Sequence, residues 1–122
     1  MRILALDVGL RKTGAAYGDS ANGIPIALDT FMHETIEAFA DHVTRIVRDK
    51  KIDRIVLGLP LLPSGDEGSQ SDYVRSCGVA LARLNLPVDY LDERYTTHKS
   101  TEYDGDAAAA CDLLSVALKK AV

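Results

Sequence analysis

The chain has 122 residues, with 14 Lys and Arg against 18 Asp and Glu, which gives a formal net charge of −4. This length fits one domain over residues 1–122, since single domains cluster near ~100–150 residues. The excess of acidic residues argues against a protein that binds nucleic acid through its net charge alone. No apolar run approaches the ~18 residues of a membrane helix, and two cysteines are too few for a disulfide framework, so we expect a soluble, cytoplasmic protein.

The first part of the chain predicts three strands and a helix. Residues 2–8 contain the apolar run Ile3-Leu4-Ala5-Leu6, which is typical of a buried strand. Residues 14–18 and 24–28 predict two further strands, so that the three form an antiparallel meander. A helix from about residue 35 to residue 50 is indicated by one apolar stripe: Ile36, Phe39, Ala40, Val43, Ile46 and Val47.

The remaining chain alternates buried strands with helices. Residues 54–59 and 88–92 predict strands, and Ser69 with Asp72 resembles a capping pair that opens the helix between them. Right-handed crossovers place both strands parallel to the first one. A last helix carries one apolar stripe: Ala110, Leu113, Leu114, Ala117 and Leu118. We therefore predict an α/β fold, a mixed five-stranded sheet of a hairpin meander plus parallel strands with helices on both faces.

Three acids from distant parts of the sequence are candidates for one metal site. Asp7 ends an apolar strand, where an ionised carboxylate is costly unless it is paired or coordinated. Glu93 follows a later parallel strand, at the edge where open α/β sheets place their sites, and Asp112 lies early in the last helix. Two charges ~4 Å apart repel by roughly 4 kcal/mol at an effective dielectric near 20, so such a cluster requires a cation. Oxygen ligands favour Mg²⁺ or Mn²⁺ over zinc.

Each acid also has a purely structural interpretation. Asp7 could accept hydrogen bonds from the turn that follows it, Glu93 could form an ion pair, and Asp112 could favour the dipole of its helix. In the turn, Gly9 allows close backbone approach, and Arg11 and Lys12 can reach a phosphate, although a solvated turn explains them equally well.

The histidines and cysteines indicate no catalytic or metal-binding pattern. His33 and His42 lie at or near the start of the first helix, where we expect solvated side chains. Cys77 and Cys111 fall near apolar stripes and are expected to be buried thiols.

Four stretches match the motifs of a known family. Residues 5–16 contain Asp7-Val8-Gly9-Leu10-Arg11-Lys12-Thr13-Gly14, which matches D-x-G-x-[KR]-x-[IT]-G, and residues 55–61 match V-G-L-P-L. Residues 92–97 match D-E-R-x-[ST]-T, and residues 112–118 resemble the start of a terminal helix, D-x-x-[AS]-A-x-x-[IL]. In these motifs the chain resembles the YqgF/RuvX family of Holliday-junction resolvases, within the RNase H-like superfamily.

The resemblance implies an RNase H-like fold and a divalent-metal nuclease. By the same resemblance, Asp7, Glu93 and Asp112 would be the catalytic acids and would bind Mg²⁺ or Mn²⁺ in a two-metal mechanism. Arg11, Lys12 and Arg94 are the candidates for phosphate contacts. Family members are linked to processing of the 5′ end of precursor 16S ribosomal RNA and were earlier proposed to resolve four-way DNA junctions. The expected partners are therefore precursor rRNA or branched DNA and ribosomal precursor particles, with the chain a monomer or homodimer.

The segment before the last helix departs from the family pattern. Residues 97–111 are shorter than in relatives and carry Glu102, Asp104 and Asp106 in place of basic residues, which puts the grip on nucleic acid in doubt. Asp106 is also a rival to Asp112 for the third acid. The alternative function is a non-catalytic ribosome-assembly or nucleic-acid-binding factor with a degenerate nuclease site. Actin-like kinases share the D-x-G-x-x-x-x-G opening, but they need two lobes and this chain supplies at most one.

Overall fold

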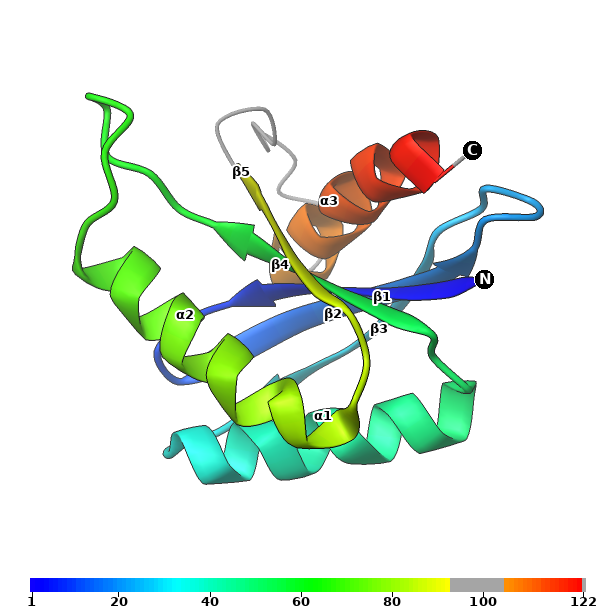
Figure 1. Ribbon diagram of the computed structural model, residues 1–122, viewed down its shortest axis with the longest axis horizontal. Helices are drawn as coiled ribbons and strands as arrows, with labels where there is room; N and C mark the ends of the chain where they lie inside the picture. The colour runs from blue at the N-terminus through cyan, green and yellow to red at the C-terminus, as the bar shows by residue number, and fades with distance from the viewer. Residues whose placement is uncertain (93–104, 122) are drawn as a thin grey trace.

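The structure, a computed structural model, describes the backbone of residues 1–92 and 105–121 and the side chains of residues 1–92 and 108–119. It is a five-stranded sheet with helices on both faces (Figure 1). None of the helices in these ranges is long and apolar enough to span a bilayer. The elements in chain order are β1 (Arg2–Val8), β2 (Lys12–Asp19), β3 (Ile26–Met32), α1 (Ile36–Lys50), β4 (Arg54–Leu59), α2 (Ser69–Ala80), the 3₁₀ turn η1 (Leu81–Leu84), β5 (Val88–Asp92) and α3 (Gly105–Ala121).

The sheet has the strand order β3-β2-β1-β4-β5. β2 pairs antiparallel with both β1 and β3, whereas β4 pairs parallel with both β1 and β5. The predicted meander and the predicted parallel strands are therefore confirmed. The carboxyl ends of β1, β4 and β5 lie at one edge of the sheet, which we call the carboxyl edge.

Alternating side chains of β1 build one core on each face of the sheet. Leu4 and Leu6 belong to the larger core, which α1 and α2 cover on one face. Ile3 and Ala5 belong to a smaller core on the other face, under α3 (Figure 1). The predicted stripe of α3 supplies the rest of this smaller core together with β2 and β4: Ala16, Val56, Ala110, Leu113, Leu114, Ala117 and Leu118.

The predicted bounds of two strands and one predicted cap are wrong. The second strand runs from Lys12 to Asp19 rather than over residues 14–18. The third strand starts at Ile26 rather than at residue 24, because Pro25 has no N–H to donate to the sheet, and it continues to Met32. The cap of α2 is Gly68, which makes no side-chain cap hydrogen bond, so Ser69 and Asp72 do not form a capping pair. By contrast, Thr35 caps α1 by accepting a hydrogen bond from the backbone N–H of Ala38 at 3.0 Å.

Close packing of α2 against β5 depends on Gly78. A Cβ at this position would overlap the hydroxyl of Tyr90 and would lie 3.3 Å from Cδ1 of Leu57. We expect Gly78→Ala to lower the free energy of unfolding by about 1 kcal/mol, because overpacking costs ~1–3 kcal/mol and alanine recovers at most ~1 kcal/mol in helix propensity. Urea unfolding measures this change. In a Tyr90→Phe background, which lacks the overlapping oxygen, the loss should shrink; equal losses in both backgrounds would contradict the packing argument.

Candidate functional site

Asp7 lies at the carboxyl edge, one residue before β1 ends. It lies two positions after Ala5, so the alternation of the strand directs its side chain to the α3 face of the sheet. The residue is half-buried, and Gly14 is its cross-strand neighbour in β2. The central strand therefore delivers a carboxylate to the edge where the sequence predicts the site.

A hollow of about 130 Å³ adjoins Asp7 at this edge. Its walls come from the end of β1, from the turn that follows β1, from the segment after β4 and from the start of α2: Asp7, Val8, Gly9, Leu10, Pro60, Gln70 and Tyr73. The side-chain donors among them are a carboxylate, an amide and a phenol, with no thiol or imidazole. Hard oxygen donors of this kind suit Mg²⁺ or Mn²⁺ rather than zinc, so the surroundings of Asp7 fit the predicted metal.

The turn between β1 and β2 and the first residue of β2, together residues 9–12, carry two of the three predicted phosphate-binding side chains. The backbone N–H of Gly9 donates to the carbonyl of Lys12 at 2.9 Å, and a Cβ on Gly9 would lie 2.6 Å from that carbonyl oxygen. Only glycine therefore fits at this position. Arg11 and Lys12 are exposed, so their cationic ends can meet a ligand in front of Asp7.

Two neighbouring elements hold this turn from outside. The hydroxyl of Tyr73 in α2 donates to the carbonyl of Leu10 at 3.3 Å. The backbone N–H of His33, just after β3, donates to the carbonyl of Arg11 at 2.8 Å. The turn is therefore held by α2 and by the residue that follows β3, in addition to its own internal hydrogen bond.

The segment between β4 and α2 folds back on itself beside the hollow. Leu61 and Glu67 form an isolated antiparallel bridge, and Ser71 donates its hydroxyl hydrogen bond to the carbonyl of Pro60. The guanidinium of Arg75 donates two hydrogen bonds to the Glu67 carboxylate, at 2.6 and 2.8 Å, and this pairing lowers the pKa of Glu67. These contacts anchor the V-G-L-P-L segment to α2 and so fix Pro60 beside Asp7.

The structure does not bring Asp112 to the sheet. Asp112 is exposed, and it lies about half a helical turn from both Ala110 and Leu114, which are fully buried against the smaller core. Its side chain is therefore on the outer side of α3. This position follows from the phase of the helix, because a residue opposite the buried stripe faces away from the strand that carries Asp7; the role of Asp112 stays a prediction.

Three other predicted residues lie outside the part of the chain whose side chains are described. Glu93 and Arg94 directly follow Asp92, the last residue of β5, and neither is described. The backbone of Asp106 belongs to the first turn of α3, but its side chain is not described. Within the described residues, no three His, Cys, Asp or Glu side chains are grouped as a metal ion would require, so the three-acid cluster stays a prediction.

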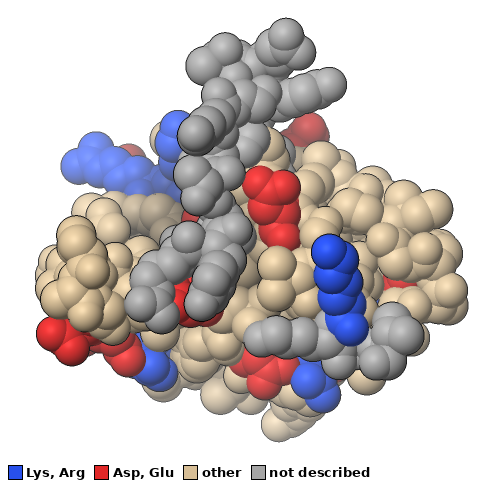
Figure 2. Space-filling model, turned by 90° about the horizontal axis from the view of Figure 1, so that it is seen from above, with Lys and Arg blue, Asp and Glu red and all other residues tan. Residues whose placement is uncertain are grey.

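The α3 face carries mixed charge. Figure 2 shows this face, on which Lys and Arg side chains are scattered among Asp and Glu and form no continuous basic surface over the described residues. Bulk attraction of nucleic acid is therefore weak here, in line with the net charge of −4. Local cations such as Arg11 and Lys12 would have to supply the contacts to phosphate.

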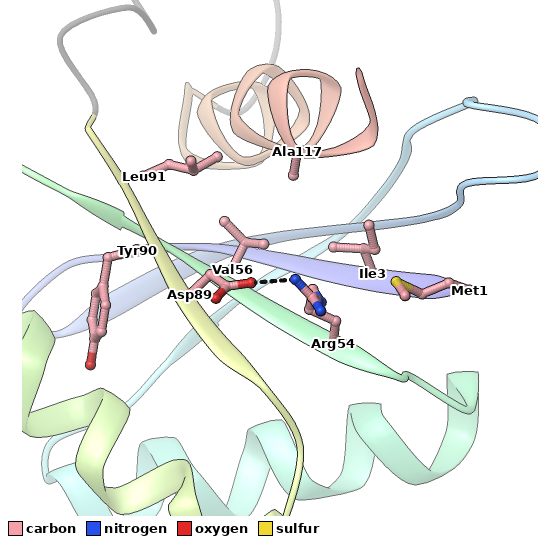
Figure 3. A pocket seen from close by; sticks show the side chains of 8 residues that line it. All are labelled: Met1, Ile3, Arg54, Val56, Asp89, Tyr90, Leu91 and Ala117. Carbon is pink, nitrogen blue, oxygen red and sulfur yellow. Dashed lines mark hydrogen bonds and ion pairs between the residues drawn. The ribbon is translucent and has the colours of Figure 1, made fainter. Parts of the chain in front are cut away.

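A larger hollow lies away from Asp7. It measures about 450 Å³ and is lined by Met1, Ile3, Arg54, Val56, Asp89, Tyr90, Leu91 and Ala117, near the amino ends of β1 and β4 (Figure 3). Its floor is apolar, and its charged groups, Arg54 and Asp89, neutralise each other through a 2.8 Å ion pair. The four residue steps from Ile3 to Asp7 span ~13 Å of strand, so this hollow does not adjoin the predicted acid.

Sequence reasoning missed three side chains near the carboxyl edge. Gln70 and Tyr73 line the hollow beside Asp7. His33 was expected to be solvated, but it is 3% exposed. One feature of the sequence could have indicated that His33 is buried: in the chain it lies between Phe31 and Phe39, two aromatic residues that are both buried.

Comparison with known proteins adds a family and a fold. The family model described as "RuvX: Holliday junction resolvase" matches residues 1–120. A relative from Heliobacterium modesticaldum, named "Putative pre-16S rRNA nuclease", is 36% identical over 98 residues, which cover 80% of this chain and 66% of the relative. A relative of the same name from Chloroflexus aurantiacus is 36% identical over 96 residues, which cover 78% of this chain and 63% of the relative. The chain thus spans just under two thirds of the length of these two relatives.

Among solved structures, RuvC of T. thermophilus in complex with a Holliday junction substrate is similar over 99% of this chain and 95% of that chain. The TM-score is 0.71 and the sequence identity is 11%, so this similarity concerns the fold. The RNase H-like fold expected from the sequence is confirmed by this match and by the strand order of the sheet.

Proposed function

Because the chain belongs to the RuvX family of Holliday junction resolvases, we propose that it is a divalent-metal-dependent nuclease that hydrolyses phosphodiester bonds in structured nucleic acid. The observation that carries this proposal is the position of Asp7. A carboxylate at the end of the central strand adjoins a hollow, and it is followed directly by a tightly held turn with two exposed cations. Its substrate would be the 5′ region of precursor 16S rRNA, as the names of the relatives suggest, with a four-way DNA junction as the alternative.

In this proposal the metal is held by carboxylates from three elements. Asp7 comes from β1, and Glu93 directly follows β5, whose carboxyl end lies at the same edge as that of β1. The third acid comes from α3. Bound to these oxygens, Mg²⁺ or Mn²⁺ would supply Lewis-acid polarisation of the scissile phosphate and of water.

For the third acid, α3 offers two candidates that the structure treats differently. Asp112 is exposed on the side of the helix away from the sheet. Asp106 is four residues before Ala110, which is one helical turn, and Ala110 is fully buried against the smaller core. The phase of the helix therefore favours Asp106 over Asp112 as the partner of Asp7.

Arg11, Lys12 and Arg94 would hold the phosphates of the substrate. Arg11 and Lys12 are exposed on the turn directly after Asp7, and Arg94 follows Glu93 in the chain. A guanidinium group can donate two hydrogen bonds to one phosphate, whereas an ammonium group acts as a point charge. Together the two kinds of side chain can orient the nucleic-acid strand in front of the carboxylates. Because the described residues form no continuous basic surface on the α3 face, we expect affinity to depend on these few contacts.

Metal removal tests the proposed activity. Purified protein with Mg²⁺ or Mn²⁺ should cut a precursor 16S rRNA fragment or a four-way DNA junction, and excess EDTA should stop the cutting until Mn²⁺ is restored. Gel electrophoresis of end-labelled substrates measures the products, and a linear duplex of the same sequence serves as the control for structure dependence. Cleavage that persists in EDTA would contradict metal dependence. A folded chain that binds no Mn²⁺ at millimolar concentration by calorimetry would instead favour the non-catalytic ribosome-assembly factor.

A further inference from the structure

His33 is buried directly behind the turn that follows Asp7. It comes one residue after β3, and its ring is 3% exposed. The ring packs against two aromatic rings, with centroids 5.8 Å from Phe31 and 5.3 Å from Phe39. The surroundings of this titratable side chain are therefore largely apolar.

Two hydrogen bonds connect His33 to the turn. Its backbone N–H donates to the carbonyl of Arg11 at 2.8 Å. Its ring atom Nε2 lies 2.7 Å from the hydroxyl oxygen of Thr13, which is fully buried and immediately follows Lys12. The ring and the backbone of one residue thus hold both sides of the segment that presents Arg11 and Lys12.

This arrangement suits a neutral imidazole. Among the described residues, Nδ1 of His33 is buried and has no hydrogen-bond partner. In the neutral ring one nitrogen carries a proton and the other accepts, so the Thr13 hydroxyl can satisfy Nε2 in either tautomer. In the cation both nitrogens donate, so protonation would leave a buried N–H of a charged ring without an acceptor.

The charges around His33 oppose its protonation. Burial lowers the pKa of His33 below its ordinary value near 6.5, and the neighbouring His42 of α1 acts in the same direction. The pKa of His42 is itself lowered, first by burial and then by Arg45. Arg11 and Lys12 add positive charge from the turn, and the acid next in sequence, Glu34, is exposed to solvent.

We propose that neutral His33 is a positioning residue that holds the β1–β2 turn beside Asp7, and that its protonation loosens this turn. The consequence for substrate rests on the proposed function, because the backbone that carries the exposed side chains of Arg11 and Lys12 is then no longer held. A group whose pKa is lowered by folding takes up its proton more readily when the structure opens. The hold on the turn is therefore complete above about pH 6.5 and weakens as the pH falls through the lowered pKa of His33.

Hydrogen exchange tests the positioning role without any substrate. The backbone amides of Gly9 and His33 report the two hydrogen bonds of the turn, and NMR of the His33 ring gives its pKa. In the wild type, protection of both amides should fall as His33 is protonated, by up to about tenfold for each unit by which its pKa lies below the ordinary value. In His33→Gln, whose amide can still meet Thr13 but does not titrate, protection should be independent of pH. The same pH dependence in His33→Gln and in the wild type would overturn the proposal.

Two matched comparisons separate this role from general destabilisation. Thr13→Ser keeps the hydroxyl and should keep the protection of the turn, whereas Thr13→Val keeps the shape and should lose protection even at neutral pH. His42→Gln changes the neighbouring titratable ring and should leave the pH dependence in place. Protection that is equal in the two Thr13 variants would also overturn the proposal.

A functional measurement links the turn to substrate. In metal-free buffer, affinity for the rRNA fragment or the junction should fall on acidification in the wild type and hold in His33→Gln. A turn that loosens with His33 protonation while cleavage with Mn²⁺ is absent at every pH would support the positioning role and contradict only the proposed function. Affinity that falls equally in both proteins would overturn the link between His33 and the phosphate contacts.

Discussion

Asp7→Asn is expected to abolish phosphodiester cleavage while the chain stays folded. Asparagine has nearly the same shape as aspartate but lacks the charge that binds a divalent cation. Metal ions contribute several kcal/mol of transition-state stabilisation, and a loss of about 4 kcal/mol corresponds to a ~10³-fold lower rate. Cleavage of end-labelled precursor rRNA and of a four-way junction under single-turnover conditions measures this change.

The variant also makes a prediction about stability and metal binding. Asp7 lies at the carboxyl edge, near the predicted positions of other acids, so removal of its charge should not lower the urea midpoint. Calorimetry should show weaker Mn²⁺ binding. Asp29→Asn, in the edge strand β3, makes the same change at an exposed residue two strands away and should leave cleavage intact. Rapid cleavage by Asp7→Asn would remove Asp7 from the catalytic machinery.

The second large effect is expected to separate two acids of the same helix. We expect Asp106→Asn to reduce cleavage by about 10³-fold, for the same reason as Asp7→Asn. Asp112→Asn should change the rate less than about twofold, because an exposed side chain opposite the buried stripe lies outside the site. Each substitution removes one negative charge from α3, so the pair controls for net charge and for helix composition.

The opposite outcome is informative as well. If Asp112→Asn abolishes cleavage and Asp106→Asn does not, the acid predicted from the D-x-x-[AS]-A-x-x-[IL] motif is correct, and α3 must turn about its axis when substrate binds. Similar moderate losses in both variants would point to electrostatic effects of α3 on the substrate rather than to a metal ligand. Circular dichroism of both variants checks that α3 is retained.

The sequence predicted the fold well because its signals are local. The apolar run of β1 marked the strand Arg2–Val8 with the observed bounds, and the stripe that begins at Ile36 marked α1. Strand ends were less predictable, because Pro25 and the register shift between Thr13 and Ala15 act through pairing with a neighbouring strand. Gly68 as the cap of α2 was missed, since Ser69 offered the more familiar side-chain cap.

The site was only partly predictable. The position of Asp7 followed from strand alternation, but whether one histidine is buried depends on which rings pack around it, and that is not encoded by the neighbours of His33 in the chain. For Asp112 the information was present. The predicted stripe through Ala110 and Leu114 already places residue 112 on the opposite side of the helix, so helical phase and motif spacing favour different residues as the third acid.

The smaller core has a consequence for synthesis on the ribosome. Ile3, Ala5, Ala16 and Val56 form its floor, yet the helix that covers them, α3, emerges only after most of the chain has been translated. Until α3 has been synthesised, the nascent protein exposes an apolar face of the sheet, which can bind chaperones or associate incorrectly. If α3 also carries the third acid, as we propose, the site is completed only when α3 docks on this face, so a nascent chain without α3 would lack a complete site.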